Sequence, residues 1–382
     1  MAKRHLAMQM LGALLASMIG GAAAAAPAPA EPPMEPAGAA PARAASAPQR
    51  RWLTGVPRVA GRVLPSRIGL VVNDADPYSV EVGEHYRRAH ALADDQVLHV
   101  DLPVQPHLAV AELERLRRRI DEFFGDRVQG LALAWVKPFA VECQSITSAV
   151  TLGFDPGVCA STCARQALSP YFNSRSAAPW RDHGLRPSML LAASSPALAH
   201  RLIDRASTSI GALALRGVAP SRVHYMNTAD AARNVRASLF PPAGAVPRLG
   251  LEVLVEDGDL PAAGSERVVL VQTGVARFSG AEAIGWLPGA LADHLTSYGG
   301  VLDRSAGQST ALDWIDAGVT ASYGTVSEPC NHPQKFPHPQ LLLMHYLQGS
   351  TALEAYWKSV AWPRQGLFVG DPLAAPFARM RP

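Results

Sequence analysis

An alternation of short apolar runs and amphipathic stretches opens the folded part of the chain and limits the folds available to it. The apolar runs at 67–73, 97–100 and 130–136 are typical of strands covered on both faces. Between them, Asp76 and the proline after it form the start signal of one helix. Residues 110–123 carry apolar side chains at helical spacing. A β-α-β-α-β start predicts a parallel sheet with right-handed crossovers.

The same pattern continues to the end of the chain, with one interruption. Residues 137–186 are rich in turn formers and are predicted to be an insertion. Elsewhere we expect strands at 188–193, 223–226, 248–255, 267–272, 319–325 and 367–369, and helices at 198–203, 228–240, 309–316 and from the capping box at Thr351. The predicted fold class is α/β, with a doubly wound, mostly parallel sheet flanked by helices.

The amino end is predicted to be a secretory signal peptide over residues 1–26. Lys3 and Arg4 precede an apolar run that ends in small residues, and an uncleaved anchor is the alternative. Residues 27–51 are predicted to be a linker, because 27–49 contain seven Pro and nine Ala. Residues 52–382 then form a single domain. No later run reaches the ~18 apolar residues of a transmembrane helix. We therefore expect an exported protein, periplasmic or extracellular.

Composition and motifs exclude several function classes. The formal charge is +3, from 35 basic and 32 acidic residues, which does not predict nucleic-acid binding. The chain lacks G-x-G-x-x-G, Walker A, G-x-S-x-G and H-E-x-x-H. Nucleotide and flavin cofactors, the usual hydrolase elbow and zincin peptidases are therefore unsupported, and we expect no cofactor.

Four cysteines in an exported chain favour disulfides over catalytic thiols. They are Cys143, Cys159, Cys163 and Cys330. Three pairings are open to them, and the sequence does not choose among these. Cys143 has two near partners, Cys159 and Cys163, and whichever of the two is left over can reach Cys330.

Polar residues follow several predicted strands, and ligands of open α/β sheets bind at the carboxyl ends of strands. Asp371 also fits a turn before its proline. We expect a pocket at these ends that is lined by Asp74, Asp293, Thr296, Ser327, Glu328, His332 and Asp371.

Two clusters carry candidate catalytic groups. His294 and Ser297 lie three residues apart, so one helical turn would place a base and a hydroxyl on the same face. Cys330 and His332 could form a thiolate–imidazole pair. The alternative in both cases is a structural role. The spacing C-x-H-x5-H, which ends at His338, matches no strong zinc signature, so no metal site is predicted.

The runs 288–300, 317–331 and 369–373, with the early run 71–86, resemble an uncharacterised family of exported bacterial proteins. That family occurs in bacteria with exosortase and PEP-CTERM sorting systems. The resemblance implies a cell-envelope protein whose partners are envelope proteins or polysaccharides, and it implies no particular activity.

More distantly, the order of elements is similar to gingipain-like, caspase-fold cysteine peptidases. Thr273-Gly274 stands where their Gly-His pair would be, and Thr296-Ser297 where their cysteine would be. The catalytic dyad of those peptidases is thus missing at both places.

Two hypotheses follow, beside a third in which Cys330, His332 and His338 bind a metal. In the first, the protein is a hydrolase with Ser297 or Cys330 as nucleophile and His294 or His332 as base. In the second, it is a non-catalytic binding or accessory protein that keeps a peptidase-like fold. A His294 side chain that points into the core, away from any hydroxyl or thiol, favours the second. The sequence predicts neither the substrate nor the oligomeric state.

Overall fold

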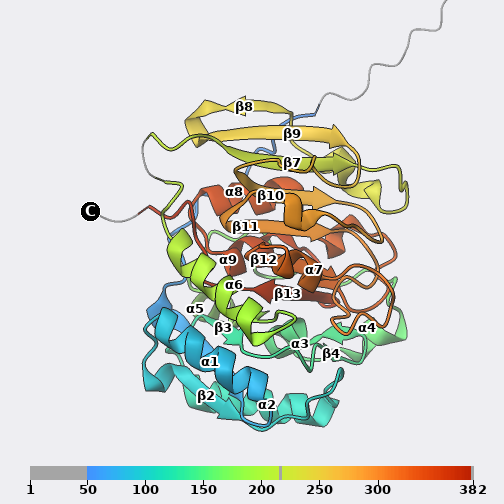
Figure 1. Cartoon of the computed structure of the whole chain (residues 1–382). Helices are drawn as coiled ribbons and strands as arrows, with labels where there is room; N and C mark the ends of the chain where they lie inside the picture. Colours follow the sequence, from blue (N-terminus) through green and yellow to red (C-terminus); the bar gives the residue numbers. More distant parts are fainter. Residues whose placement is uncertain (1–49, 215–216, 380–382) are drawn as a thin grey trace, which may run out of the picture. The chain divides into compact units, whose positions relative to one another are not determined.

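The computed structural model describes residues 50–214 and 217–379, so the predicted signal peptide and most of the linker lie outside the described residues. Within these ranges eleven strands form one sheet in the order β2-β1-β3-β6-β13-β12-β11-β10-β7-β9-β8 (Figure 1). The strands of the sheet are β1 (Ile68–Asn73), β2 (Val97–Val100), β3 (Gly130–Leu133), β6 (Ser188–Leu190), β7 (Ser221–Asn227), β8 (Gly244–Val246), β9 (Leu251–Asp257), β10 (Val268–Thr273), β11 (Trp286–His294), β12 (Ala321–Thr325) and β13 (Gly366–Gly370).

Helices cover both faces of this sheet. In Figure 1, α1, α6 and α7 lie in front of the strands, and α8 and α9 lie behind them. In addition, α3 packs against β6 and β13, and α2 packs against α3. The helices are α1 (Pro77–Ala89), α2 (Val110–Phe124), α3 (Ile146–Leu152), α4 (Pro156–Ala160), α5 (Pro179–His183), α6 (Pro196–Ser209), α7 (Ala311–Asp316), α8 (Pro339–Leu347) and α9 (Ala352–Ser359).

Most neighbouring strands are parallel, which confirms the predicted fold class. β1 pairs in parallel with β2 and β3, and β10 pairs in parallel with β7 and β11. Two strands run against a neighbour: β8 is antiparallel to β9, and β13 is antiparallel to β12. The direction of β13 means that the residue after it lies at the opposite end from the residues after β12.

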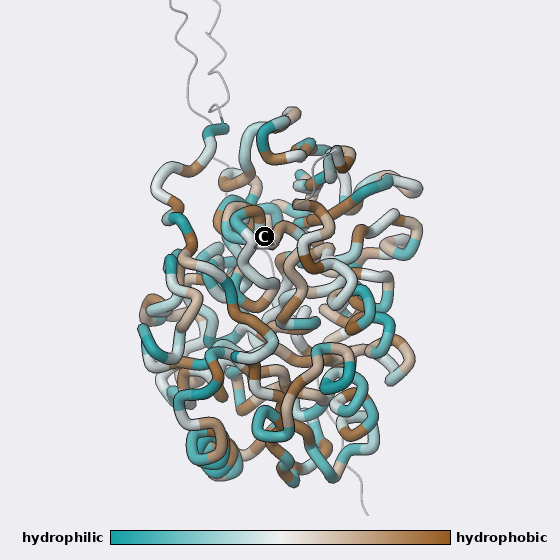
Figure 2. The backbone as a smooth tube through the Cα atoms, turned by 90° about the vertical axis from the view of Figure 1, so that its left-hand side faces the viewer, coloured by the Kyte–Doolittle hydropathy of each residue, from teal (hydrophilic) through white to brown (hydrophobic). Residues whose placement is uncertain are grey.

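The core lies between the sheet and its helices. Every residue of β1, β10 and β13 is buried, as the uninterrupted apolar runs predict for strands covered on both faces. Figure 2 shows hydrophobic backbone segments inside the molecule, while many outer loops are hydrophilic. In the described ranges, no helix has both the length and the apolar character that crossing a membrane requires.

The chain departs from the predicted elements in two places that bear on the site. Residues 228–240 do not form the expected α-helix; only Asn234–Leu239 form a short, tighter 3₁₀ helix. Local side-chain bonds compete with the helix here, since the Asn234 side chain accepts from the backbone N–H of Thr228. In addition, β11 continues as a strand through His294, so this histidine and Ser297 do not share a helical turn.

The predicted insertion contains a small hairpin of its own. Strands β4 (Ala140–Val141) and β5 (Gln144–Ser145) pair antiparallel and lead into α3. The hydroxyl of Ser145 donates to the carbonyl oxygen of Gly366 at the start of β13, and its backbone N–H donates to that of Arg364. The hairpin is therefore bonded directly to the main sheet.

Candidate functional site

The end of β11 carries two of the predicted site residues, and both are completely buried. Asp293 and His294 are the last two residues of the strand. Their partners in the sheet are Gln272 and Thr273 at the end of β10. The ends of β10 and β11 thus lie side by side, and the side chains of Asp293 and His294 face other protein groups.

Both ring nitrogens of His294 are occupied. The indole Nε1–H of Trp314 donates to Nδ1 over 3.0 Å, and Nε2–H donates to the carbonyl oxygen of Ser309 over 2.9 Å. Because indole can only donate, the imidazole is neutral with its proton on Nε2. Burial lowers the pKa of His294 to about 4. This histidine cannot take a proton from a substrate or a hydroxyl without losing its bond to Trp314.

Aromatic side chains pack around His294, and one of them, Phe278, lines a cavity. The ring of Phe278 stacks on Trp314 and meets His294 edge-on, with ring centroids 4.0 and 5.1 Å away respectively. Phe278 and Ser309 line a cavity of about 330 Å³, whereas His294 has no exposed surface. The imidazole therefore lies behind the cavity wall.

The hydroxyl predicted to work with His294 lies in the loop that follows β11. Ser297 is partly exposed, and among the described residues no hydrogen bond joins it to His294. Its carbonyl oxygen accepts from the Thr325 hydroxyl. Thr296 is buried, accepts from Arg233 Nε and donates to the side chain of Gln308. Ser297 and Thr296 thus take part in hydrogen bonds that hold this loop against the rest of the protein.

Gly299 and Gly300, which follow soon after Ser297, allow the loop to pack closely against β12. A Cβ added to Gly300 would lie 2.6 Å from the carbonyl oxygen of Gly324 on β12. A Cβ added to Gly324 would lie 2.2 Å from the carbonyl carbon of Gly299. The backbones of the loop and of β12 touch because all three positions lack side chains.

Asp293 is held by a buried ion pair. Arg236 donates one guanidinium nitrogen to the Asp293 carboxylate and another to the carbonyl oxygen of Thr273. Gln272 Nε2 donates to the second carboxylate oxygen over 2.8 Å. Burial raises the pKa of Asp293, and the charge of Arg236 partly offsets this. Both acceptor oxygens are bonded, so the carboxylate has a structural role in this arrangement.

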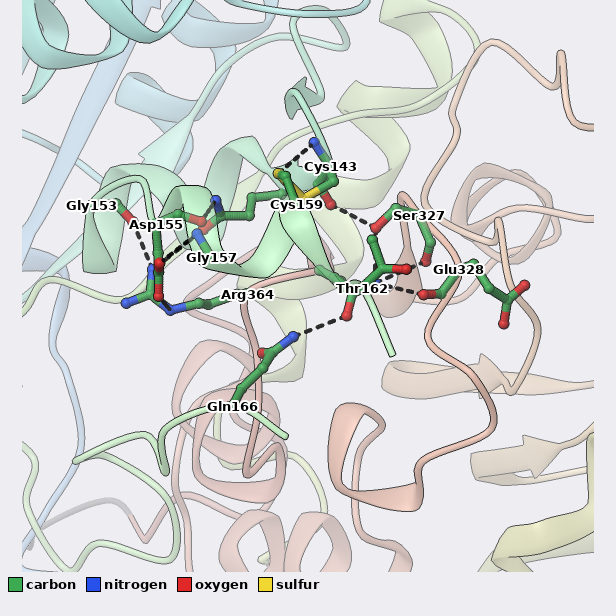
Figure 3. Close-up of a disulfide and its surroundings, with 12 residues drawn as sticks. Cys143, Gly153, Asp155, Gly157, Cys159, Thr162, Gln166, Ser327, Glu328 and Arg364 are labelled. Atoms are coloured by element: carbon green, nitrogen blue, oxygen red, sulfur yellow. Dashed lines mark hydrogen bonds and ion pairs between the residues drawn. A yellow bond between two sulfur atoms is a disulfide. The ribbon is translucent and has the colours of Figure 1, made fainter. Parts of the chain in front are cut away.

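The second predicted cluster fastens the insertion to the main sheet; Figure 3 shows the contact that Ser327 makes with Cys143. The Ser327 hydroxyl donates to the carbonyl oxygen of Cys143 over 2.6 Å. Cys330 forms a disulfide with Cys163, and His332 Nε2–H donates to the carbonyl oxygen of the same Cys163. Glu328 accepts from the backbone N–H of Cys330. Cys330 therefore carries no thiol, and we call these contacts between 327–335 and the insertion the clasp.

Lys335, a buried lysine of the same sequence cluster, completes the clasp. The ammonium of Lys335 donates to the carbonyl oxygen of Thr162, next to the disulfide. Burial lowers the pKa of Lys335 to about 8. The second disulfide, Cys143–Cys159, lies within the insertion. All four cysteines are paired, in one of the arrangements that the sequence left open.

Asp371 is not brought together with the other predicted pocket residues. It follows β13 at the start of β12, where its backbone N–H donates to the carbonyl oxygen of Thr320. His90 Nε2 lies 2.9 Å from the Asp371 carboxylate, and both side chains are buried. Burial lowers the pKa of His90, but the charge and hydrogen bond of Asp371 outweigh it and leave the pKa raised.

Asp74, in contrast to His294, lines an open cavity of about 400 Å³. His99 Nδ1 lies 2.7 Å from Asp74 Oδ1, and both side chains are more than half exposed. Arg115 and Arg119 of α2 line the same cavity. None of these three residues was predicted as a site residue, although His99 lies near the end of a predicted strand and the arginines are spaced i, i+4. Among the described residues no cluster of His, Cys, Asp and Glu has the geometry of a metal site.

Comparisons with known proteins find no matching family model and no matching curated protein. The chain is similar to the crystal structure of the Arg-specific cysteine proteinase gingipain R, with 11% identity over 81% of this chain and 78% of that chain, at a TM-score of 0.41. A complex of Porphyromonas gingivalis gingipain pro- and mature domains gives 11% identity, 81% and 79% coverage and a TM-score of 0.41. A structure described only as a protease is 11% identical over 82% of this chain and 78% of that chain, at a TM-score of 0.43. At these scores the function has to be argued from the chain's own residues.

Proposed function

We propose that the protein is an exported binding or accessory protein of the cell envelope, and that its strand-end residues maintain structure instead of cleaving a substrate. The observation that carries this proposal is the environment of His294. A general base needs a free nitrogen within reach of the nucleophile's proton. Here one nitrogen accepts from Trp314, the other donates to Ser309, and the ring is buried.

The candidate nucleophiles support the same proposal. A disulfide sulfur cannot act as a thiolate nucleophile, and Cys330 is bonded to Cys163. A serine hydroxyl is a weak nucleophile without an adjacent base, and Ser297 has no hydrogen bond to His294. The geometry therefore favours the non-catalytic hypothesis over the hydrolase hypothesis.

Export is supported by the cysteines. Disulfides persist in oxidising compartments and are rare in the bacterial cytosol. Both disulfides join segments of the insertion or its clasp, and none of the four cysteines is free. An envelope partner, protein or polysaccharide, agrees with the sequence resemblance.

The test of catalysis uses the full chain purified from the periplasm of an expression host. We expect no hydrolysis of fluorogenic peptide and ester panels and no labelling by a fluorophosphonate probe. The variant Ser297→Ala is compared with Ser305→Ala, which changes an exposed serine of the same loop. Hydrolysis or labelling that disappears in Ser297→Ala and persists in Ser305→Ala would overturn the proposal.

The test of export follows the same full chain in fractionated cells. We expect it outside the cytoplasm, with no thiol that reacts with an alkylating reagent under denaturing conditions. Retention in the cytoplasm, or a mass increase from alkylation without prior reduction, would contradict the export part of the proposal while leaving the catalytic part standing.

A further inference from the structure

The cavity beside Asp74 is built by two paired strand ends. Asn73 and Val100 are partners in the parallel pair β1–β2, and the backbone N–H of Asp74 donates to the carbonyl oxygen of Val100 over 2.8 Å. Asp74 and Asp101 therefore lie side by side, each directly after the end of its strand. Ligands of open α/β sheets bind at the carboxyl ends of the strands. The volume, about 400 Å³, is within the usual range of small-molecule sites.

The imidazole of His99 is oriented by Asp74. Its Nδ1 lies 2.7 Å from Asp74 Oδ1, so Nδ1–H donates to the carboxylate. Among the described residues Nε2 has no hydrogen-bond partner, and the side chain is 57% exposed. The ring thus offers one nitrogen at a fixed direction to a ligand in the cavity.

Two guanidinium groups line the cavity from α2. Arg115 and Arg119 are one turn apart on the same helix face. Arg115 has only a distant ionic contact, 3.9 Å from Glu112, and Arg119 has none among the described residues. Glu112 instead accepts from the backbone N–H of Ala109 at the start of α2. Guanidinium groups that are not committed to protein carboxylates can bind an oxyanion through paired hydrogen bonds.

The carboxylates of Asp74, Asp101 and Glu112 also line the cavity, which has an apolar floor. Asp74 is bonded to His99, and Glu112 accepts from the backbone of Ala109, so Asp101 is the carboxylate left to accept from a ligand. The carboxylate of Asp101 lines it and has no hydrogen-bond or ionic partner among the described residues. Carboxylates accept hydrogen bonds from hydroxyls and repel anions. Leu102 and Leu116 line the cavity and are buried, so they present apolar surface to the carbon atoms of a ligand.

We propose that this cavity binds a small hydroxylated anion, a sugar or polyol that carries one carboxylate or phosphate group. Arg115 and Arg119 bind the anionic group, His99 and Asp101 bind hydroxyls, and the leucines contact the carbon skeleton. An inorganic anion would leave Asp101 unused, and a neutral sugar would leave both guanidinium groups unused. The proposal does not rest on the absence of catalysis at His294, which belongs to a different part of the sheet.

Isothermal titration calorimetry with the full chain tests the proposal. The probes are glucuronate and glucose 6-phosphate, compared with glucose and with inorganic phosphate. We expect saturable binding of at least one hydroxylated anion with a Kd of about 1 mM or tighter, and weaker binding of both comparison ligands. The two anionic probes show whether carboxylate or phosphate is the preferred group.

Variants on one helix supply the matched control. Arg119→Gln should weaken binding about tenfold or more, because a charge-assisted hydrogen bond is lost. Arg118→Gln changes an exposed arginine of the same helix that does not line the cavity, and should have no effect. Circular dichroism checks that both variants fold.

Four outcomes would overturn the proposal. The first is that neither glucuronate nor glucose 6-phosphate binds saturably at concentrations up to 10-fold the expected Kd. The second and third are that glucose, or inorganic phosphate, binds as tightly as the hydroxylated anions. The fourth is that Arg118→Gln weakens binding as much as Arg119→Gln does.

Discussion

Trp314 donates its indole hydrogen to Nδ1 of His294 over 3.0 Å, from a helix that begins 17 residues after the end of β11. The bond defines the tautomer of a histidine that is completely buried. A buried neutral imidazole also makes the folded state sensitive to acid, because the unfolded chain can bind a proton that the folded chain cannot.

The first prediction concerns that acid sensitivity. Burial holds the folded-state pKa of His294 at about 4, whereas an unfolded histidine has a pKa of about 6.5. Between these values the unfolded state binds more protons, so the free energy of unfolding falls as the pH falls, by about 3 kcal/mol from this residue. His345, with a pKa of about 3, acts in the same direction. Urea unfolding at pH 7.0 and 4.5 measures the loss.

The matched variant is His294→Gln, whose amide oxygen can still accept from Trp314. Its loss of stability between pH 7.0 and 4.5 should be smaller than that of the native protein. Identical losses in the two proteins would show that His294 does not titrate in this range.

The second prediction concerns the buried pair of His90 and Asp371. The pKa of His90 is raised in the folded state, so its contribution to stability is present below a pH of about 6.5 and is lost as the pH rises through the folded-state value. Asp371→Asn keeps the shape and the acceptor for Leu373 but removes the charge. We expect this variant to lose about 3 kcal/mol at pH 5.5 and less at pH 8.5. A cost that is the same at both pH values, measured by urea unfolding, would contradict the prediction.

The third prediction compares the two disulfides. Cys163–Cys330 joins residues separated by 167 positions, and Cys143–Cys159 joins residues separated by 16. In the chain-entropy model a longer loop restricts the unfolded chain more, so loss of the long-range disulfide should cost about 2 kcal/mol more. Double Cys→Ser variants of each pair, unfolded in urea, measure the difference. A larger loss for the short-range pair would mean that the native contacts of the insertion dominate.

The fourth prediction concerns the ion pair of Arg236 and Asp293. Arg236→Met leaves the carboxylate buried without a cationic partner, which should cost about 3 to 5 kcal/mol. Adding Asp293→Asn neutralises the remaining group and should recover part of that loss. Thermal and urea unfolding of the single and double variants measure both. A double variant as unstable as Arg236→Met would show that the lost packing of the arginine, and not the unpaired charge, is responsible.

The strands with continuous apolar runs were predictable because burial on both faces leaves a strong sequence signal. Strand β10 was expected at 267–272 and spans Val268–Thr273. Strand β11 gives a weaker signal, since Pro288 and Gly289 lie inside it, and its place is determined by pairing with β10. The α-helix expected at 228–240 does not form, because short polar side chains there make hydrogen bonds to the nearby backbone.

The candidate site was less predictable, since residue types do not reveal their partners. His294 looked like a base, but its partner Trp314 lies 20 residues away and was not considered. Cys330 and Ser327 looked like site residues because they follow a strand, yet their partners lie in the insertion. Asp74 does line an open cavity, at the place where its strand ends next to the edge strand β2.

The clasp has a consequence for the order in which the protein can mature. If the chain is exported from its amino end, as proposed, Cys143, Cys159 and Cys163 emerge long before Cys330, which comes 167 residues after the last of them. During that interval three thiols are available, and only the bond between Cys143 and Cys159 leaves the correct one free. Any other early bond must be exchanged later, so efficient maturation depends on a disulfide isomerase or on the insertion folding before oxidation.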